Sequence, residues 1–158
     1  MMQQTNTNES RMQTDEPANL NLYQKGLQFA EAGQYQQALV CLQEHLRVFP
    51  DDAQALNDVG AVLHCLGFSD KSVNYFLRAH SLQPDSAQII WNLVEAYLAV
   101  NRPREAAQLF ENMEQMGILN ADVLNRTANS FLRQDNKAGA VEMLLYSLKV
   151  SRQQPVLE

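Results

Sequence analysis

The sequence predicts an all-α protein in which four helix-turn-helix repeats, about eight helices in total, stack into an α-solenoid. Three observations predict this fold class. Similar residues recur every 34 positions along the 158-residue chain, and glycine or asparagine divides the first three copies into two apolar stretches each. Within a stretch, apolar residues are spaced three or four positions apart, which is the period of an amphipathic helix.

The 34-residue period occurs at several registers. Gly33 lies 34 positions before Gly67, and Pro50 lies 34 positions before Pro84. Three further registers run through all four copies without an insertion: the small residues Ala38, Ser72, Ala106 and Ala140, the apolar residues Phe29, Leu63, Tyr97 and Phe131, and the apolar residues Leu42, Phe76, Phe110 and Leu144. Such agreement is hard to obtain by chance, so the chain is interpreted as a repeat array.

Each copy predicts two helices around a tight turn. In the second copy, Leu56 and Val59 begin an apolar stripe of helical period that ends before Gly67. Glycine suits this turn because it adopts a left-handed backbone without a Cβ clash. The third copy has Asn101 there, which also tolerates that geometry, and Pro103 opens the next helix.

The ends of the copies carry their own signals. Pro50 and Pro84 close the first two copies, and Asp52, Ser86 and Asn120 are placed to cap the helices that follow. Helices are therefore predicted near residues 20–32, 36–48, 54–66, 70–82, 88–100, 104–116, 122–134 and 138–150.

The domain organisation follows from these ranges. Residues 1–18 are rich in Gln, Asn, Thr and acids, which predicts a disordered polar tail. The repeats occupy residues 19–52, 53–86, 87–120 and 121–152, and residues 153–158 form a C-terminal tail.

Composition excludes several classes of function. Twelve Lys and Arg residues against eighteen Asp and Glu residues give a net charge of −6, which disfavours binding to nucleic acid or to an anionic membrane. The chain has no apolar run of the ~18–20 residues that span a bilayer. Two cysteines, Cys41 and Cys65, cannot build a disulfide framework. Together with a first segment unlike a signal peptide, this predicts a cytoplasmic protein.

The motifs of catalysis and of cofactor or metal binding are missing from the sequence. It has no glycine-rich phosphate loop, nucleophile elbow, HExxH or CxxC motif. Cys41 and His45 share a helix face, and His64 adjoins Cys65, but the repeat register places the two pairs on different faces. The prediction is therefore a protein that is not an enzyme and needs no cofactor or metal.

The pattern resembles the tetratricopeptide repeat (TPR) family, whose signature combines this period with aromatic, small and proline positions. The resemblance covers residues 19 to about 152 and is strongest in the first two copies. It implies a right-handed α-solenoid whose inner face, formed mainly by the first helix of each copy, binds another polypeptide. The residues that carry it are Leu22, Lys25, Gly26, Phe29, Ala38, Leu42 and Pro50, then Leu56, Val59, Gly60, Leu63, Ser72, Phe76 and Pro84, then Ile90, Leu93, Val94, Tyr97, Ala106 and Phe110, and finally Leu124, Thr127, Ala128, Phe131, Ala140 and Leu144.

Positions carried over from the family predict the residues that line the inner face. Those expected to bind a partner are Tyr23, Leu27, Asn57, Trp91, Asn92, Glu95, Asn125, Arg126, Asn129 and Arg133. Asp58, His64 and Leu98 occupy lining positions as well. The lysines of the carboxylate clamp of related co-chaperones are absent from the matching positions, and Asp58 would repel a carboxylate. Arg102, Arg126 and Arg133 nevertheless lie toward the C-terminal half of the inner face and leave room for a partner of acidic character. The favoured alternative is a scattered pattern of solvated charges.

Trp91 and the asparagines are interpreted in two ways each. Trp91 lies one position after the usual aromatic site, so it either faces the groove as an anchor or packs in the core of a slightly rotated helix. Asn57, Asn92, Asn125 and Asn129 are similar to the asparagine ladder of O-linked N-acetylglucosamine transferases, which pairs with a peptide backbone. The alternative is that they are simply solvated.

The last predicted helix is apolar on nearly every side. Leu144, Leu145 and Leu148 are therefore candidates for self-association, since solenoids normally end in a polar outer face. A second copy, another partner or further sequence would cover them.

The favoured function is a non-catalytic scaffold that binds a peptide or partner helix. The alternatives are a small bacterial secretion-type TPR chaperone for an unfolded client and a structural subunit that stacks end to end.

Overall fold

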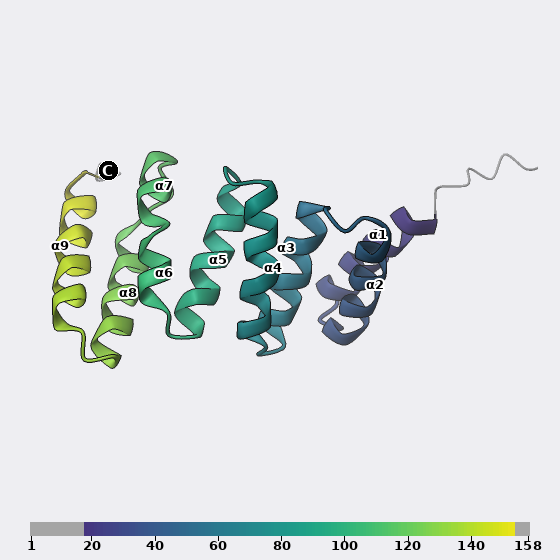
Figure 1. Cartoon of the computed structure of the whole chain (residues 1–158), viewed down its shortest axis with the longest axis horizontal. Coiled ribbons are helices and arrows are strands. Elements are labelled where there is room, and N and C mark those ends of the chain that lie inside the picture. The colour runs from purple at the N-terminus through teal and green to yellow at the C-terminus, as the bar shows by residue number, and fades with distance from the viewer. Residues whose placement is uncertain (1–17, 154–158) are drawn as a thin grey trace, which may run out of the picture.

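The computed structural model describes residues 18–153, and every regular element in that range is a helix. The helices lie side by side in a single elongated array (Figure 1). Of the predicted tails over 1–18 and 153–158, residues 1–17 and 154–158 lie outside the described residues, and Ala18 belongs to the first helix. The helices are α1 (Ala18–Glu31), α2 (Tyr35–Val48), α3 (Ala53–Cys65), α4 (Ser69–Leu82), α5 (Ala87–Ala99), α6 (Pro103–Ala107), α7 (Phe110–Gln115), α8 (Ala121–Arg133) and α9 (Lys137–Gln153).

The structure confirms the α-solenoid of helix-turn-helix repeats. The pairs are α1 with α2, α3 with α4, α5 with α6 and α7, and α8 with α9. The helix predicted over 104–116 is divided into α6 and α7, because the Leu109 amide bonds back to the carbonyl of Ala106, three residues earlier. The last helix runs to Gln153, so the predicted C-terminal tail begins inside it. The other predicted helix ends agree with the structure within two residues.

The turn within each repeat is made by one residue with a left-handed backbone. Its φ is 72° at Gly33, 82° at Gly67, 56° at Asn101 and 54° at Asp135. These four positions are 34 residues apart, and the first three were expected to turn the chain. Asp135 was not identified from the sequence, although aspartate is among the few residues that tolerate this conformation. The 34-residue period of the sequence therefore corresponds to a left-handed residue that recurs every 34 positions in the structure.

The helix caps agree with the sequence. Asp52 accepts a hydrogen bond from the Ala55 amide at 3.0 Å, and Asn120 accepts one from the Val123 amide at 3.0 Å. Ser86 caps α5 in the same way with a longer contact of 3.5 Å. Each cap satisfies an amide that has no partner inside its helix and marks where the next repeat begins.

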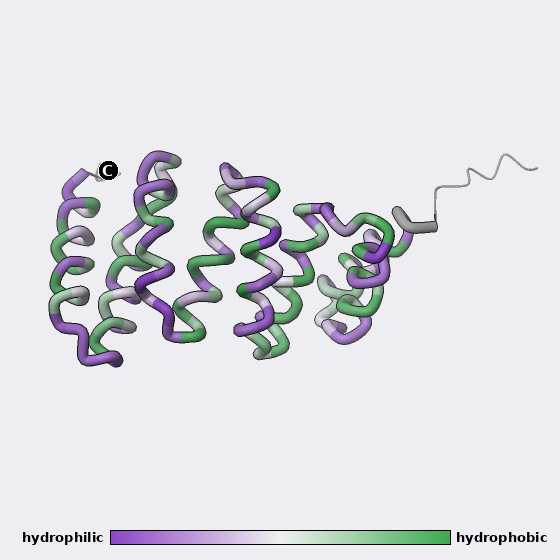
Figure 2. Tube along the Cα trace, in the orientation of Figure 1, coloured by the Kyte–Doolittle hydropathy of each residue, from purple (hydrophilic) through white to green (hydrophobic). Residues whose placement is uncertain are grey.

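The core is built from residues repeated along the array. Figure 2 shows apolar and polar residues alternating along the helices, as amphipathic helices require. The main hydrophobic cluster extends from Val73 in α4 to Val150 in α9, and Phe76 and Phe110 are among its largest fully buried side chains. A separate cluster around Leu42 and Val59 joins α1, α2 and α3. Stacking of neighbouring repeats thus buries what one hairpin could not bury alone.

The Asp52 cap predicts an acid-sensitive contribution to stability. Burial alone would raise the pKa of Asp52, but its hydrogen bonds from Ala55 and from His45, 2.9 Å away, outweigh burial and lower the pKa. A carboxyl whose pKa is lowered on folding stabilises the fold above its unfolded pKa of about 4 and loses that effect as the pH falls through its folded pKa. We expect Asp52→Ala to cost about 1 kcal/mol of unfolding free energy at pH 7 and less below pH 4.

Urea unfolding at several pH values checks this expectation. The matched control is Asp51→Ala, which removes a neighbouring exposed carboxylate that caps no helix. Equal losses for the two variants at pH 7, or a loss for Asp52→Ala that does not change with pH, would contradict the assigned role of Asp52.

Candidate functional site

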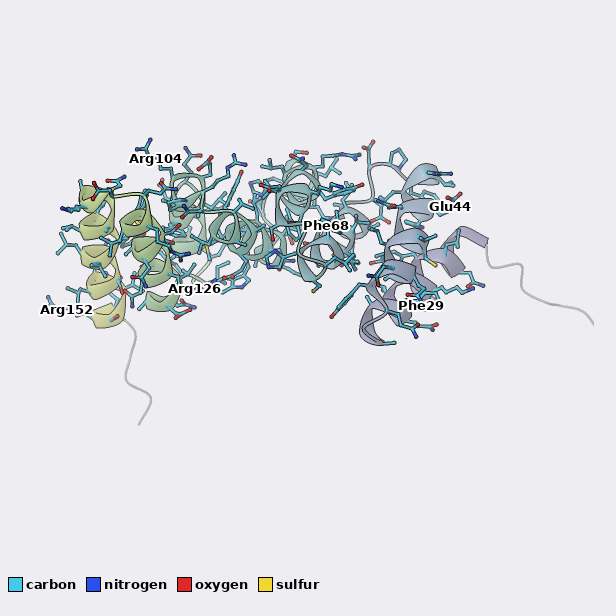
Figure 3. All side chains as sticks on the ribbon, turned by 90° about the horizontal axis from the view of Figure 1, so that it is seen from below. Phe29, Glu44, Phe68, Arg104, Arg126 and Arg152 are labelled. Atoms are coloured by element: carbon cyan, nitrogen blue, oxygen red, sulfur yellow. The ribbon has the colours of Figure 1, made fainter. Side chains whose placement is uncertain are left out.

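The first helices of the four repeats are joined by polar contacts along one face of the array. Tyr23 Oη donates to Asp58 Oδ2 at 2.6 Å, which joins α1 to α3. Further contacts join Asn57 in α3 to Asn92 in α5, and Glu95 in α5 to Arg126 in α8. We call the surface that carries these residues the inner face. Arg126 lies on this side, and Arg104 of α6 lies on the opposite side of the array (Figure 3).

The inner face is hollowed between α3, α5 and α8. This pocket, called the α8 pocket below, has a volume of about 320 Å³. His64 lines it from α3, and Leu98 provides an apolar wall that is itself 8% exposed. Four of the predicted partner-binding residues meet there. The complete lining is His64, Glu95, Leu98, Ala99, Arg126, Asn129, Ser130 and Arg133.

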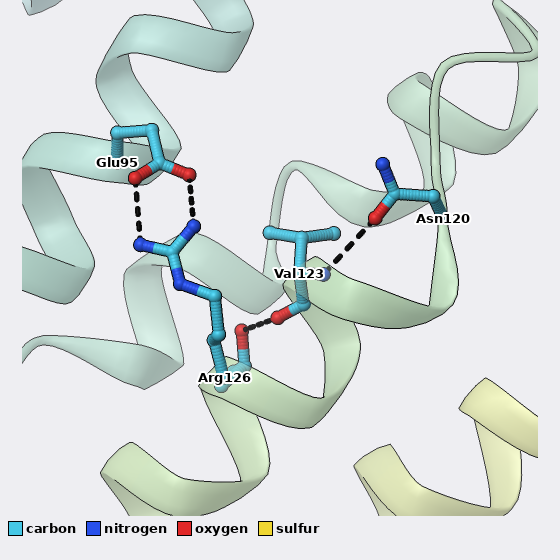
Figure 4. A network of polar contacts seen from close by, with 5 residues as sticks. Glu95, Asn120, Val123 and Arg126 are labelled. Atoms are coloured by element: carbon cyan, nitrogen blue, oxygen red, sulfur yellow. Dashed lines mark hydrogen bonds and ion pairs between the residues drawn. The ribbon is translucent and has the colours of Figure 1, made fainter.

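The helical spacing of α8 brings its polar residues together. Arg126, Asn129 and Arg133 follow one another at three and four residues, so they lie on one face of the helix. Two local hydrogen bonds lie in the first turns of the helix: the Asn120 cap, and the bond that the Thr127 hydroxyl donates to the Val123 carbonyl at 2.7 Å (Figure 4). The buried side chains of Leu124 and Phe131 anchor the helix to the main hydrophobic cluster, so the pocket rests on a fixed helix.

A bidentate ion pair forms one wall of the α8 pocket. Arg126 Nη1 and Nη2 donate to the two carboxylate oxygens of Glu95 at 2.6 and 2.7 Å (Figure 4). The hydrogen bonds that Arg126 donates to Glu95 raise the pKa of Arg126, so this guanidinium stays charged and is already paired. Arg133 is exposed, and no side chain among the described residues pairs with it. The cation that the pocket offers to a ligand is therefore Arg133.

At the α1 end of the inner face, the side chain of Tyr23 is occupied by contacts within the protein. Burial raises the pKa of Tyr23, and the hydrogen bond to Asp58 raises it further, so the hydroxyl remains protonated and donates to Asp58. The ring of Tyr23 packs with its centroid 5.1 Å from that of His45. Leu27 is half-buried beside it in α1. This end carries partly covered side chains, in contrast to the open pocket at α8.

Trp91 lies neither fully in the groove nor fully in the core. It is half-buried and packs against the main hydrophobic cluster, so part of the indole belongs to the core and part faces outward. It does not line the α8 pocket. Replacing Trp91 would disturb packing and surface together, which makes it a poor test of binding.

The asparagines do not form a continuous row of free amides. Asn57 is 1% exposed, and it accepts a hydrogen bond from Asn92 Nδ2 at 2.9 Å. The expectation that Asn57 contacts a partner directly is therefore wrong, because the side chain is buried, with its Oδ1 bonded to Asn92 and its Nδ2 donating to Asp58 Oδ1 at 3.3 Å. Asn92 is half-buried, whereas Asn125 and Asn129 are exposed. The amides open to a ligand lie on α8.

Two pocket residues were missed by the analysis of the sequence. Ala99 and Ser130 lie outside the lining positions of the family, yet both border the pocket. Ser130 is almost fully buried, and its hydroxyl donates to Asn101 Oδ1 at 2.7 Å. Asn101 is the residue that turns the third repeat, so this wall depends on a contact between repeats that no single helix pattern reveals.

Residues 18–153 contain neither a cluster of metal ligands nor a helix that could span a membrane. Three or more His, Cys, Asp or Glu side chains that could hold a metal ion do not come together anywhere in this range. Cys41 and Cys65 are free thiols. Helices α1 to α9 include none with the length and apolar character needed to cross a membrane.

Comparison with known sequences identifies one family. The sequence profile of the tetratricopeptide repeat matches residues 23–87 and 92–155. Human protein arginine N-methyltransferase 9 is 40% identical over 50 residues, which are 32% of this chain and 6% of that protein. The chain thus corresponds to a small fraction of that relative, within the repeats, and the match carries no enzymatic activity over to it.

Comparison with solved structures identifies the same fold. YrrB, described as a TPR protein with an unusual peptide-binding site, superposes with a TM-score of 0.74 at 18% identity, over 89% of this chain and 72% of that chain. A MamA structure from Desulfovibrio magneticus RS-1, comprising residues 41 to the end, has a TM-score of 0.69 at 20% identity, over 86% of this chain and 77% of that chain. At these identities the likeness concerns the fold.

Proposed function

Because the chain belongs to the tetratricopeptide repeat family, we propose that it is a non-catalytic scaffold that binds an extended peptide or a partner helix along its inner face. The observation that carries this proposal is the α8 pocket, where an unpaired Arg133, an exposed Asn129 and the apolar wall of Leu98 border one hollow. A hollow with an apolar wall and a few polar groups is the usual form of a binding site.

The chemistry of the α8 pocket favours a segment with an acidic group. The guanidinium of Arg133 can donate two parallel hydrogen bonds to a carboxylate, and the Asn129 amide can pair with a peptide backbone. Glu95 does not oppose this, because its two oxygens are occupied by Arg126. The peptide-binding site described for YrrB supports the general mode, although it does not assign a ligand to this chain.

Substitution of Arg133 tests this function. Peptides selected from a random display library on the wild-type protein provide the probe, and isothermal titration calorimetry measures their affinity. We expect Arg133→Ala to weaken binding by about 1–3 kcal/mol, because the pocket loses its free cation. Arg104→Ala is the matched control, since Arg104 is exposed on the opposite side of the array (Figure 3).

Three outcomes separate the interpretations. Weaker binding only for Arg133→Ala supports the α8 pocket. Equal affinities for both variants and the wild-type protein would contradict it. Tight binding of unfolded polypeptides regardless of sequence, unaffected by either change, would favour the secretion-type chaperone instead.

A further inference from the structure

Helix α9 ends the array of described helices with an uncovered apolar strip. Val141, Leu144, Leu145 and Leu148 are 54, 44, 62 and 57% exposed. They are spaced three, one and three residues apart, so they lie on one side of the helix. We call these four residues the α9 strip. The residues of α9 that are buried against the preceding repeat, such as Met143, lie on the other side.

Residues at the same repeat positions as Val141 and Leu144 are buried in earlier repeats. Val141 corresponds to Val73 of α4, which is 1% exposed, and Leu144 corresponds to Phe76 and Phe110, which are 2 and 1% exposed. Each of these residues has a following repeat beside it. Val141 and Leu144 therefore lie on the face that a following repeat would cover. Leu145 lies at the edge of that face, because Gln43, Leu77 and Glu111 in the same register are exposed.

The other end of the array does not fit this face. Asn21, Lys25 and Gln28 of α1 are exposed, whereas the residues in the same registers of later repeats are buried. Stacking the α1 end of a second copy onto the α9 strip would bury these three polar groups against leucine, which is costly without hydrogen-bond partners. End-to-end stacking is therefore disfavoured. The residues in the same registers are Ala55, Val59 and Val62, then Ile89, Leu93 and Ala96, and then Val123, Thr127 and Ser130.

We propose that the α9 strip is covered by the α9 strip of a second copy of this chain, in an antiparallel contact about a two-fold axis. Such an interface presents the same patch from both subunits. The order of the strip suits it, because Val141 then opposes Leu148 of the second copy, and Leu144 opposes Leu145. All four apolar residues of each chain meet apolar residues.

The surface of α9 has a receiving hollow for this contact. Gln153 lines it together with Leu145, Leu148, Lys149 and Arg152, and these last four have the spacing of the residues that form a hole in knobs-into-holes packing. In the antiparallel arrangement Val141 of the second copy lies opposite this hollow. A side chain of that size can enter it as a knob.

Charge selects the antiparallel direction. Glu142 and Lys149 are exposed and two helical turns apart, so they border the same edge of the strip. Lys149 Nζ also lies 3.7 Å from Glu114 Oε1 of its own chain, an exposed pair that leaves the ammonium able to reach a second carboxylate. In a parallel contact this edge would face the other edge of the second helix, so Glu142 and Lys149 would not meet. The antiparallel contact brings Glu142 within reach of Lys149 of the second copy, and the two-fold axis forms this pair twice.

The contact is small, which limits its strength. Four partly exposed side chains from each copy bury less than the area of a standard stable interface, so the dimer exchanges with monomer at micromolar concentrations, about 10–100 µM. The inner face is not part of this contact. Failure of the dimer would leave the proposed peptide binding untouched.

Sedimentation equilibrium of the full chain over about 5–500 µM tests the dimer. The wild-type chain is expected to shift from monomer to dimer across this range. Leu145→Glu should raise the dissociation constant by about tenfold or more, because it places a charge at the centre of the contact. Leu132→Glu is the control, because Leu132 is 50% exposed on α8 and should leave dimerisation unchanged.

Charge reversal tests the direction of the two helices. Glu142→Lys and Lys149→Glu should each weaken the dimer several-fold, and the double variant should restore it. Circular dichroism of each variant confirms that it remains folded. A chain that stays monomeric at the highest concentration would overturn the proposal. So would a dimer that Leu145→Glu leaves intact, or a double variant weaker than both single variants.

Discussion

Phe110→Ala is expected to lower the free energy of unfolding by about 3–5 kcal/mol, the cost of removing a buried phenylalanine and leaving a cavity. Phe110 opens α7, is 1% exposed and belongs to the main hydrophobic cluster. Its neighbours on both sides of the α6–α7 interruption, Ala106 and Met113, are fully buried and have little freedom to close the space. Urea unfolding followed by circular dichroism measures the loss.

The control for this prediction is Phe68→Ala. Phe68 is 50% exposed in the turn before α4, so the same chemical change there should cost less than about 1 kcal/mol. Equal losses for the two variants would show that the centre of the array contributes no more to stability than its surface.

Gly60→Ala should destabilise the protein by about 1–3 kcal/mol through overpacking. A Cβ at Gly60 would lie 2.6 Å from Cε1 and 2.8 Å from Cδ1 of Phe76, and this ring is 2% exposed. Alanine favours a helix over glycine by about 1 kcal/mol, but a ring confined on all sides costs more than that to displace. The steric clash with Phe76 therefore outweighs the gain in helix propensity, and the net effect of Gly60→Ala is a loss of stability.

A second substitution checks that the collision is the cause. The fourth repeat has Ala128 and Leu144 at the positions of Gly60 and Phe76, so Phe76→Leu should recover part of the loss in a Gly60→Ala background. The double-mutant cycle should give a coupling of about 0.5–3 kcal/mol. A Gly60→Ala variant more stable than the wild-type chain would show instead that the ring moves aside at no cost.

The fold could be predicted from the sequence because the same signals for turns and helix caps recur in successive repeats. Gly33 and Gly67 locate the turns, and the N-caps at Asp52 and Asn120 locate the next repeats, which the structure confirms. The interruption near Leu109 could not be predicted. It contains neither glycine nor proline, and it consists of one backbone hydrogen bond that reaches back three residues in place of four.

The candidate site was only partly predictable. Register placed Glu95, Arg126, Asn129 and Arg133 on one face, and the structure brings these four together in the α8 pocket. Register could not show which of them bond to each other. The burial of Asn57 depends on a contact between residues 35 positions apart, and that pairing is set by how two repeats stack.

The division of the core described above has a consequence for how the chain comes apart. No described residue of α1 or α2 belongs to the main cluster, which begins in α4 and continues to α9. Opening the first hairpin therefore leaves that cluster whole, and amides of α1 and α2 can exchange with solvent at a lower free energy than those of α5 and α8. The α8 pocket is carried by the more protected part of the array, so a binding surface persists while the far end frays.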